Sequence, residues 1–426
     1  MKLSVQGVSG MPDILPDESR RWHRLESAVR AAMQACGYQE IRTPILESEE
    51  LFVQSVGADT DVVAKEMYRC QAGKDDSQRT YCMRPEGTAA VVRALAQAGL
   101  LRGGRPRVWY MGPMFRHERQ QAGRQRQFHQ FGCEFLNHAA PAADVEVIGL
   151  CADIFGRLGI AADVELLVNN LGRPEERRAY RDALREHLAA RRGELAPIDQ
   201  ERLARSPLRV LDSKEAESAA AIAAAPRLEK FLTPDSQEYF ARVLAGLDAL
   251  GIAHRVDPLL VRGLDYYNLT VFEWIDPAAA GRQNSLVGGG RYDGLLARIS
   301  DSDCAGTGMA AGMERILQRL ADAEEWTQDV YLGLLDGEYD EARLLRLAAA
   351  WRAAGLRVQT HLQKDKIGGF LKLASSSKAR YAAFVGARER AAGAIAVKPL
   401  RDGSEQFSLA ADAAPAEAAR QLGEQR

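Results

Sequence analysis

The sequence predicts an α+β fold: an antiparallel sheet flanked by helices, interrupted by a helical insertion and followed by a small α/β domain. Three observations predict it. Two strand-like runs, 107–116 and 128–136, are joined by a basic connection typical of a long hairpin. A second, glycine-rich block of strand-like runs covers 259–320. Beyond about residue 325, strand and helix patterns alternate, as they do in small α/β units.

Length and composition limit the class of protein. The 426 residues correspond to roughly three domains. Hydrophobic residues at 46% and charged residues at 27% exclude a disordered, collagenous or membrane-spanning chain. The N-terminus lacks the apolar segment of a signal peptide, and therefore we expect a cytoplasmic protein with no membrane partner. The net charge of -2 gives no indication of a nucleic-acid partner.

The first elements are a helix, a short extended run and a strand that leads into a second helix. Residues 18–36 have apolar side chains at helical spacing, and Gly37 follows at the expected C-cap. Pro44 interrupts the strand-like run 41–47, which favours a sheet edge or an interface. The strand 80–86 continues into a helix for which Thr88 is the expected N-cap.

Alternation in the strand 128–136 separates two faces. Gln130, Gly132 and Glu134 share one face, and the large apolar residues between them form the core face. In the partner strand, Gly112 and Arg116 share a face by the same parity. Glycines leave room for a ligand against the sheet. Alternation equally allows Gln130 and Glu134 to face water on a half-exposed sheet.

The rest of the chain changes in composition and in predicted secondary structure from one segment to the next. A helix at 144–158 and a strand at 164–170 precede a helical stretch rich in Ala, Arg and Glu. Glycine-rich strands then lead into an amphipathic helix that contains Arg315. The expected domains are 1–325, interrupted by the insertion 173–251, then an α/β domain over 326–405 and a C-terminal tail over 406–426.

Common nucleotide and metal motifs are absent from the sequence. No run matches the P-loop or the dinucleotide fingerprint. The six cysteines and seven histidines show no metal-ligand spacing, so a structural zinc is not predicted and no metal site follows from spacing alone. Several arginines beside glycine-rich strands have the fork that suits phosphate, although each one could equally be salt-bridged. They are Arg84, Arg116, Arg262, Arg291 and Arg315.

Taken together, these segments resemble the class II aminoacyl-tRNA synthetases, and the histidyl-tRNA synthetases in particular, over nearly the whole chain. The run IRTPILE (41–47) resembles motif 1, MFRHER (114–119) with RQFHQFGCE (126–134) resembles motif 2, and AAGMERI (310–316) resembles motif 3. Two further segments resemble the histidine-specific signatures of that family: LVRGLDYY (260–267) and GGGRYDG (288–294). The run RPEGT (84–88) supports the same assignment.

The resemblance implies a two-step ligase reaction. Histidine attacks ATP to give histidyl-adenylate and pyrophosphate, and the histidyl group then passes to the 3′ end of tRNA(His). The implied catalytic residues are Arg262, Arg116 and Arg315. The implied ATP-binding residues are Arg116, Glu118 and Arg315, with Mg²⁺ bound to the phosphates.

The resemblance also implies how histidine is bound. Glu86, Thr88 and Gln130 match the positions that hold the α-amino group. Glu134 and Tyr267, with Tyr266 or Tyr292, match those that bind the imidazole. The full implied set is Glu86, Gly87, Thr88, Gln130, Glu134, Arg262, Tyr266, Tyr267 and Tyr292.

Nucleic-acid and subunit contacts follow from the resemblance as well. The motif 2 loop would contact the tRNA acceptor end through Arg119, Arg124 and Arg126. The α/β domain over 326–405 resembles an anticodon-binding domain, the insertion 173–251 resembles a domain over the acceptor arm, and motif 1 implies a homodimer. The basic surface of the insertion could instead be a solvated face.

Two positions depart from the pattern. Gln120 stands where the family commonly has proline, and Ser9 stands where it commonly has a basic residue. The first departure puts the details of acceptor-end recognition in doubt. An alternative reading is a non-catalytic, histidine-binding regulatory subunit of ATP phosphoribosyltransferase. Such paralogues typically lack the C-terminal domain and several active-site residues, which this sequence retains.

Overall fold

The computed structural model describes residues 5–58, 60–71, 80–118, 124–205, 207–211, 213, 215–264, 266–279, 284–321, 328–335, 337–401, 404–411 and 415–423. The chain forms two compact units, Met1–Ala321 and Asp322–Arg426, which are described one at a time. Within the described ranges, no helix has both the length and the apolar character that crossing a membrane requires.

The larger unit is built on an eight-stranded sheet with the order β1-β5-β6-β11-β10-β9-β7-β8. The antiparallel sheet predicted from the sequence is confirmed, because each pair from β5 to β7 in that order is antiparallel, and the short outer strands β1 and β8 pair in parallel. The strands are β1 (Gln39–Glu40), β5 (Arg107–Phe115), β6 (Gln127–Leu136), β7 (Glu165–Asn170), β8 (His254–Val256), β9 (Asn268–Ile275), β10 (Ser285–Arg291) and β11 (Gly306–Gly312).

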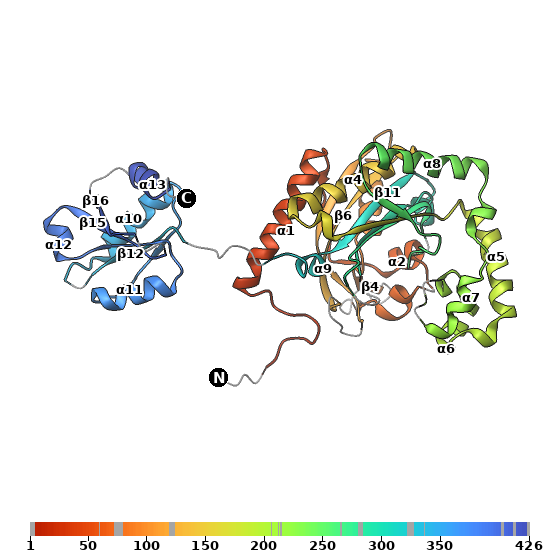
Figure 1. Ribbon diagram of the computed structural model, residues 1–426, viewed down its shortest axis with the longest axis horizontal. Coiled ribbons are helices and arrows are strands. Elements are labelled where there is room, and N and C mark those ends of the chain that lie inside the picture. The colour runs from red at the N-terminus through yellow and green to blue at the C-terminus, as the bar shows by residue number, and fades with distance from the viewer. Residues whose placement is uncertain are drawn as a thin grey trace. The chain divides into compact units, whose positions relative to one another are not determined.

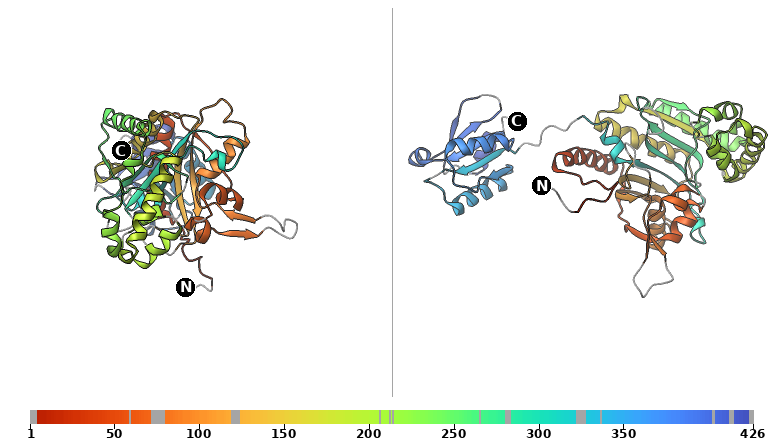
Figure 2. Two further views of the ribbon diagram at one scale, coloured as in Figure 1. Left: turned by 90° about the vertical axis from the view of Figure 1, so that its right-hand side faces the viewer. Right: turned by 90° about the horizontal axis from the view of Figure 1, so that it is seen from below.

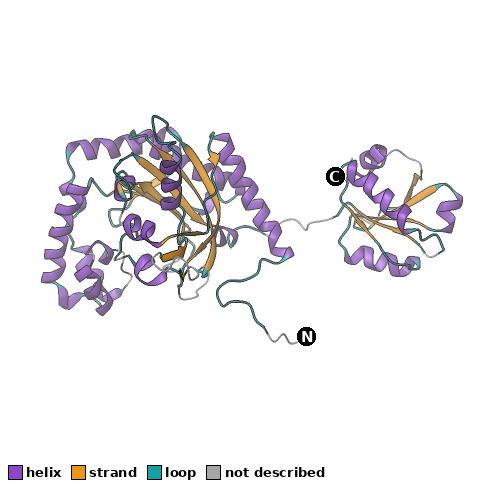
Figure 3. Ribbon diagram, turned by 180° about the vertical axis from the view of Figure 1, so that it is seen from behind, coloured by secondary structure: helices purple, strands orange, loops and turns teal. Residues whose placement is uncertain are grey.

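Four helices cover one face of this sheet, which we call the helical face (Figure 1). They are α1 (Pro16–Ala35), α4 (Pro141–Leu158), α8 (Pro234–Ala249) and α9 (Met313–Leu317). In Figure 3 the orange strands of the sheet lie among these purple helices. The helix α1 turns Leu25, Val29 and Met33 inward at helical spacing. They join Phe131 and Phe135 of β6 in one apolar cluster, so the predicted core face of β6 is confirmed.

The opposite face, which we call the pocket face, packs against α2 (Glu49–Val56) and α3 (Thr88–Gln97). A small sheet with the order β2-β4-β3 lies beside these helices. Its strands are β2 (Leu46–Ser48), β3 (Arg69–Gln71) and β4 (Thr80–Met83), and the orange ribbons of β3 and β4 extend away from the large sheet in Figure 2. Of the run 41–47, only the last two residues are strand, in β2. β1 ends before the run begins, and residues 41–45, which include Pro44, form no strand.

The stretch 173–251 is helical, as the sequence predicts, and contains α5 (Pro174–Ala190), α6 (Pro197–Arg205), α7 (Ala219–Ala223) and α8. Its last helix packs on α4 through Val243 and Leu247, which belong to the cluster on the helical face. Glu176 joins the two ends of the stretch. Its carboxylate accepts hydrogen bonds from the backbone N–H of Thr233 at 2.6 Å and from the hydroxyl of Ser236 at 2.9 Å.

The smaller unit is a five-stranded sheet with the order β13-β12-β14-β15-β16. Its elements are β12 (Val330–Leu334), α10 (Glu341–Ala353), β13 (Val358–Thr360), α11 (Ile367–Ser376), β14 (Tyr381–Val385), α12 (Ala387–Ala391), β15 (Ala394–Pro399), β16 (Phe407–Ala410) and α13 (Pro415–Gly423). The stretch 406–426, predicted as a tail, contributes β16 and α13. Leu409 and Leu422 are buried there, because both complete the apolar cluster of this unit.

Candidate active site

Glycines line the pocket face in neighbouring strands. A Cβ at Gly308 of β11 would overlap the carboxylate of Glu134, and a Cβ at Gly288 of β10 would overlap the guanidinium of Arg262. Two large polar side chains therefore lie flat against the sheet where a side chain at either glycine would exclude them.

Glu134 is fully buried at the centre of the pocket face. Its Oε1 accepts a hydrogen bond from the hydroxyl of Thr88 at 2.8 Å, and its Oε2 accepts one from the hydroxyl of Tyr292 at 2.5 Å. Burial raises the pKa of Glu134 to about 8, against the opposing effect of these hydrogen bonds. The prediction that this face could be solvated is wrong, because Gln130 is buried as well.

Glu86 and Thr88 lie at the start of α3, next to Glu134. The carboxylate of Glu86 accepts hydrogen bonds from the backbone N–H of Thr88 at 2.7 Å and of Ala89 at 2.9 Å. Glu86 therefore caps the helix, and Gly87 takes the N-cap position expected for Thr88. The hydroxyl of Thr88 is free of capping and reaches Glu134 instead. Burial raises the pKa of Glu86.

Gln130 and Tyr110 add two polar groups to the same face. The Oε1 of Gln130 is buried and has no hydrogen-bond partner among the described residues, which favours a ligand group opposite it. Tyr110 was not singled out from the sequence, although it has the same parity as Gly112 and Arg116. Its ring occupies the space above Gly132, where a Cβ would lie 2.5 Å from the hydroxyl.

Three tyrosines of the two signature segments gather beside Glu134. The ring of Tyr266 lies 4.7 Å from that of Tyr267 and 5.8 Å from that of Tyr292, measured between centroids. All three are buried, and burial raises the pKa of each phenol. The tyrosines thus stay neutral hydrogen-bond donors around a single carboxyl group.

Arg262 lies between this cluster and β9. Its guanidinium pairs with Glu273 and stands 5.8 Å from the ring centroid of Tyr267. Burial lowers the pKa of Arg262, but the charge of Glu273 and the two neighbouring tyrosines outweigh burial and raise it overall. Glu273 has no recognisable motif around it in the sequence, so only the fold identifies it as the partner of Arg262.

Two more predicted arginines lie on the other side of the site. The Nε of Arg116 donates to the carbonyl of Pro85 at 2.8 Å, and its guanidinium stands 5.3 Å from the ring centroid of Phe128. Arg315 of α9 donates to the carbonyl of Ser285 at 2.7 Å. Burial lowers the pKa of Arg315, and so do the positive charges of Arg124 and Arg116. This concentration of positive charge suits an anionic ligand.

Two of the three predicted tRNA-contacting arginines, Arg124 and Arg126, lie just before β6. Arg124 pairs with Glu118 at 2.9 Å. Arg126 donates from its backbone N–H to the carbonyl of Gly10 at 2.8 Å, which ties the N-terminal segment to the loop. Arg119 and the unusual Gln120 lie outside the described residues.

Two arginines that the sequence groups with possible phosphate ligands are occupied elsewhere. Arg84 donates to the carbonyl oxygens of Pro113 at 2.9 Å and of Thr43 at 2.8 Å. Arg291 is fully buried and pairs with Asp144 at 2.7 Å. The interpretation of these two as phosphate ligands is wrong, because residue type alone cannot tell which partner a guanidinium finds in the fold.

Comparisons with known proteins agree with this arrangement. A family model described as histidyl-tRNA synthetase matches residues 10–316, and one for an anticodon-binding domain matches residues 334–421. The histidine-tRNA ligase of Laribacter hongkongensis (strain HLHK9) is 43% identical over 96% of this chain and 97% of its own length. The histidine-tRNA ligase of Synechococcus sp. (strain JA-3-3Ab) is 44% identical over 96% of this chain and 97% of its own length.

A solved structure agrees with the sequence relatives. The crystal structure of apo histidyl-tRNA synthetase from S. aureus has a TM-score of 0.78 and 32% identity, and it covers 96% of this chain and 98% of its own. Since a family model matches well over half of the chain and two relatives match nearly all of it, the chain belongs to the histidyl-tRNA synthetase family.

Proposed function

We propose that the protein is a histidine-tRNA ligase, which forms histidyl-adenylate from L-histidine and ATP and transfers histidine to the 3′ end of tRNA(His). The observation that carries the proposal is the fully buried Glu134, which accepts hydrogen bonds from Thr88 and Tyr292 and shares the pocket face with the guanidinium of Arg262 over Gly288. The identity of 43% and 44% to two such ligases, over nearly the whole chain, supports the same reaction.

The pocket suits histidine because each end of the amino acid has its own polar groups. Glu134, with Tyr266, Tyr267 and Tyr292, would hold the imidazole. Glu86, Thr88 and Gln130 would hold the α-amino group, to which the unpartnered Oε1 of Gln130 is a suitable acceptor. A pocket of buried polar groups rejects amino acids that leave those groups unpaired.

In the first step, a carboxylate oxygen of histidine attacks the α-phosphorus of ATP. The bond between the α-phosphorus and the oxygen that bridges it to the β-phosphate breaks, and pyrophosphate leaves. The negative charge that accumulates there needs fixed positive groups more than it needs an acid or base. Arg262 would neutralise the attacking carboxylate and the α-phosphate. Arg116 and Arg315 would hold the phosphates. Burial lowers the pKa of Arg315, and the nearby charges of Arg124 and Arg116 lower it further, which supports an anion beside it.

Magnesium would arrive with ATP. In the described residues no group of three or more acidic, histidine or cysteine side chains could hold a metal by itself. Mg²⁺ bound through phosphates needs only one or two protein carboxylates, and Glu118, 3.9 Å from Arg116, fits that requirement. When bound, the ion would neutralise the phosphates that leave as pyrophosphate.

The partners of the ligase extend beyond the pocket. Arg124 and Arg126, with Arg119, would contact the acceptor end of tRNA(His), and the matched anticodon-binding domain would contact its anticodon. A homodimer through motif 1 fits the exposed side chains of Ile45 and Leu46, which are 44% and 49% accessible. The cytoplasmic location stays a prediction from the sequence.

Histidine-dependent exchange of pyrophosphate into ATP tests the proposal. Removing the guanidinium in Arg262→Ala should lower the exchange rate at least about 100-fold, because the charge that stabilises the reacting phosphate is lost. The matched control is Arg255→Ala, which removes a more exposed arginine that pairs with Glu165 on the outer strands.

Two results would count against the proposal. Equal exchange with histidine and with other amino acids would contradict the ligase, and a rate within a few-fold of normal in Arg262→Ala would contradict the role of that residue. The regulatory-subunit alternative predicts histidine binding without any exchange.

A further inference from the structure

Arg291 and Tyr292 are neighbours in the chain but lie on opposite faces of the sheet. The side chain of Arg291 is fully buried on the helical face, between α4 and α8. Tyr292 points to the pocket face, where its hydroxyl donates to Glu134. The backbone just before them is unusual: Gly290 has φ +151°, and the pairing of β10 with β9 shifts register between Gly290 and Arg291.

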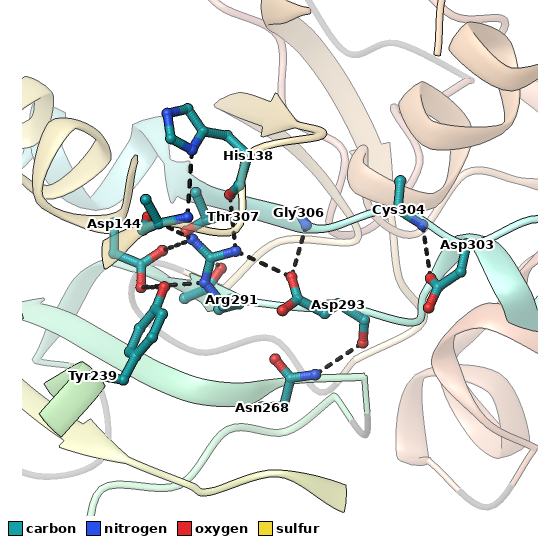
Figure 4. A network of polar contacts seen from close by, with 12 residues as sticks. His138, Asp144, Tyr239, Asn268, Arg291, Asp293, Asp303, Cys304, Gly306 and Thr307 are labelled. Carbon is teal, nitrogen blue, oxygen red and sulfur yellow. Dashed lines mark hydrogen bonds and ion pairs between the residues drawn. The ribbon is translucent and has the colours of Figure 1, made fainter. Parts of the chain in front are cut away.

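The guanidinium of Arg291 is held by a set of buried acceptors, shown in Figure 4. Its Nη2 donates to Asp144 Oδ1 at 2.7 Å, and its Nη1 donates to the carbonyl of His138 at 3.1 Å. Tyr239 of α8 donates its hydroxyl to Asp144 Oδ2 at 2.9 Å. A buried charge is tolerated only with such complete pairing, and the pairing fixes one geometry.

Asp293 holds the chain on the other side of Tyr292. Its Oδ1 accepts from Nη1 of Arg291 at 3.1 Å and from the backbone N–H of Gly306 at 2.9 Å. The backbone N–H of Tyr292 donates to the carbonyl of Gly306 at 2.8 Å. Asn268 donates to the carbonyl of Asp293 at 2.8 Å. The residues before and after Tyr292 are therefore both anchored.

The ring of Tyr292 also packs closely against the backbone of Gly306. A Cβ at Gly306 would overlap the ring, and a Cβ at Gly308 would overlap the carboxylate of Glu134. The hydroxyl of Tyr292 and the Oε2 of Glu134 meet at 2.5 Å in this space. A small rotation of the backbone at Tyr292 would break that contact, because the ring carries the hydroxyl far from its own Cα.

We propose that Arg291, Asp144 and Asp293 are positioning residues that fix the hydroxyl of Tyr292 against Glu134 and so set the affinity of the pocket for histidine. They touch neither substrate nor the reacting atoms. The proposal rests on the proposed function, since it takes the Glu134 pocket as the histidine site. It gives Arg291 a role distinct from the phosphate binding considered from the sequence, and it gives Asp293 a role that the sequence did not suggest.

The test measures the dissociation constant for histidine by calorimetry, with the KM for ATP in pyrophosphate exchange as a second readout. Asp293→Ala should weaken histidine binding about tenfold or more, because the hydroxyl of Tyr292 would no longer be held in place to donate to Glu134. The same variant should leave the KM for ATP within about twofold. Asp293→Asn retains an Oδ1 acceptor and should restore most of the affinity. Asp293 suits the purpose because its side chain is 29% exposed, so the variants should fold.

A double-mutant cycle with Tyr292→Phe separates positioning from a general structural effect. If Asp293 acts through the hydroxyl of Tyr292, then Asp293→Ala should weaken histidine binding by no more than about twofold when added to Tyr292→Phe. Equal losses in both backgrounds, or unchanged histidine affinity in Asp293→Ala, would overturn the proposal.

A second pair of variants tests the helical face. Asp144→Asn should weaken histidine binding, whereas Glu146→Gln should not. Glu146 lies two residues further along α4 and also binds an arginine and a tyrosine, Arg107 at 2.7 Å and Tyr38 at 3.1 Å, but away from Tyr292. Equal losses in the two variants would overturn the role of Asp144.

The binding readout also distinguishes the two levels of the argument. Histidine binding that depends on Asp293, in a protein with no exchange activity, would support the positioning role and contradict the ligase. Exchange activity in a protein whose histidine affinity does not change in Asp293→Ala would support the ligase and contradict the positioning role.

Discussion

Glu134 concentrates the chemistry of the pocket in one residue. It is fully buried, accepts hydroxyl hydrogen bonds from Thr88 and Tyr292, and has its pKa raised to about 8. Near neutral pH such a carboxyl group holds its proton in much of the population. A ligand with its own titratable ring nitrogen is therefore matched by a partner that titrates in the same pH range.

This residue gives a pH-dependent prediction. The folded state keeps the Glu134 proton up to about pH 8, whereas the unfolded chain releases it near the ordinary glutamate pKa of 4.5. The stability from this group is therefore complete below the unfolded pKa and is lost as the pH rises through the folded pKa, by up to about 1.4 kcal/mol per pH unit. Glu134→Gln carries no titrating proton. Its unfolding free energy should fall less than that of the natural protein between pH 5 and pH 8.

Denaturant unfolding of both proteins across that pH range measures the difference. The interpretation would be wrong if the two unfolding free energies changed in parallel, because Glu134 would then have the same protonation in the folded and unfolded chains.

At the scale of single residues, the sequence predicts which face of a strand a side chain occupies but not which partner it binds. Alternation correctly placed Gln130, Gly132 and Glu134 on one face, because side-chain direction in a strand depends on parity alone. The true partners of Arg84 and Arg291 could not be found this way. They are carbonyl groups and Asp144, which come from distant parts of the chain, and no local pattern records them.

Among the elements, the glycine strands β10 and β11 do most to shape the site. Gly288 and Gly308 are required by the side chains that lie on top of them rather than by turns. Gly308→Ala would place a methyl group on the Glu134 carboxylate and 2.5 Å from the carbonyl oxygen of Cys133. The backbone oxygen cannot move away cheaply. We expect Gly308→Ala to lower the unfolding free energy by about 1–3 kcal/mol and to weaken histidine binding.

Gly312→Ala is the matched control on the same strand. No atom of the described residues lies within 4 Å of a Cβ at Gly312, so the stability of Gly312→Ala should stay within about 0.5 kcal/mol of the natural protein. Urea unfolding measures both variants. Equal stability of Gly308→Ala and Gly312→Ala would contradict the view that the pocket floor has no room for a methyl group.

Prediction of elements succeeded where periodicity was strong and failed where a tertiary contact decided. The helix α4 and the strands β6 and β7 were expected from their patterns. The cap of α3 was not, because Glu86 reaches two backbone N–H groups from outside the helix. The strand β16 was also missed, because its four residues are ordered by pairing with β15.

At the scale of the whole molecule, the near-neutral charge conceals a local concentration. Besides burial, the charges of Arg116 and Arg124 lower the pKa of Arg315, in a chain whose net charge is -2. A net charge sums the whole chain and does not report such a local cluster of arginines. Order and spacing of motifs along the chain therefore carried more functional information than composition did.

Selection of histidine for transfer to tRNA is tested by charging tRNA(His) with the purified full chain, with ATP and each amino acid supplied in turn. We expect charging with histidine at a rate at least about 10⁴-fold above that with any other amino acid, because unpaired polar groups exclude the rest. Charging with a different amino acid, or histidine binding without any charging, would contradict it.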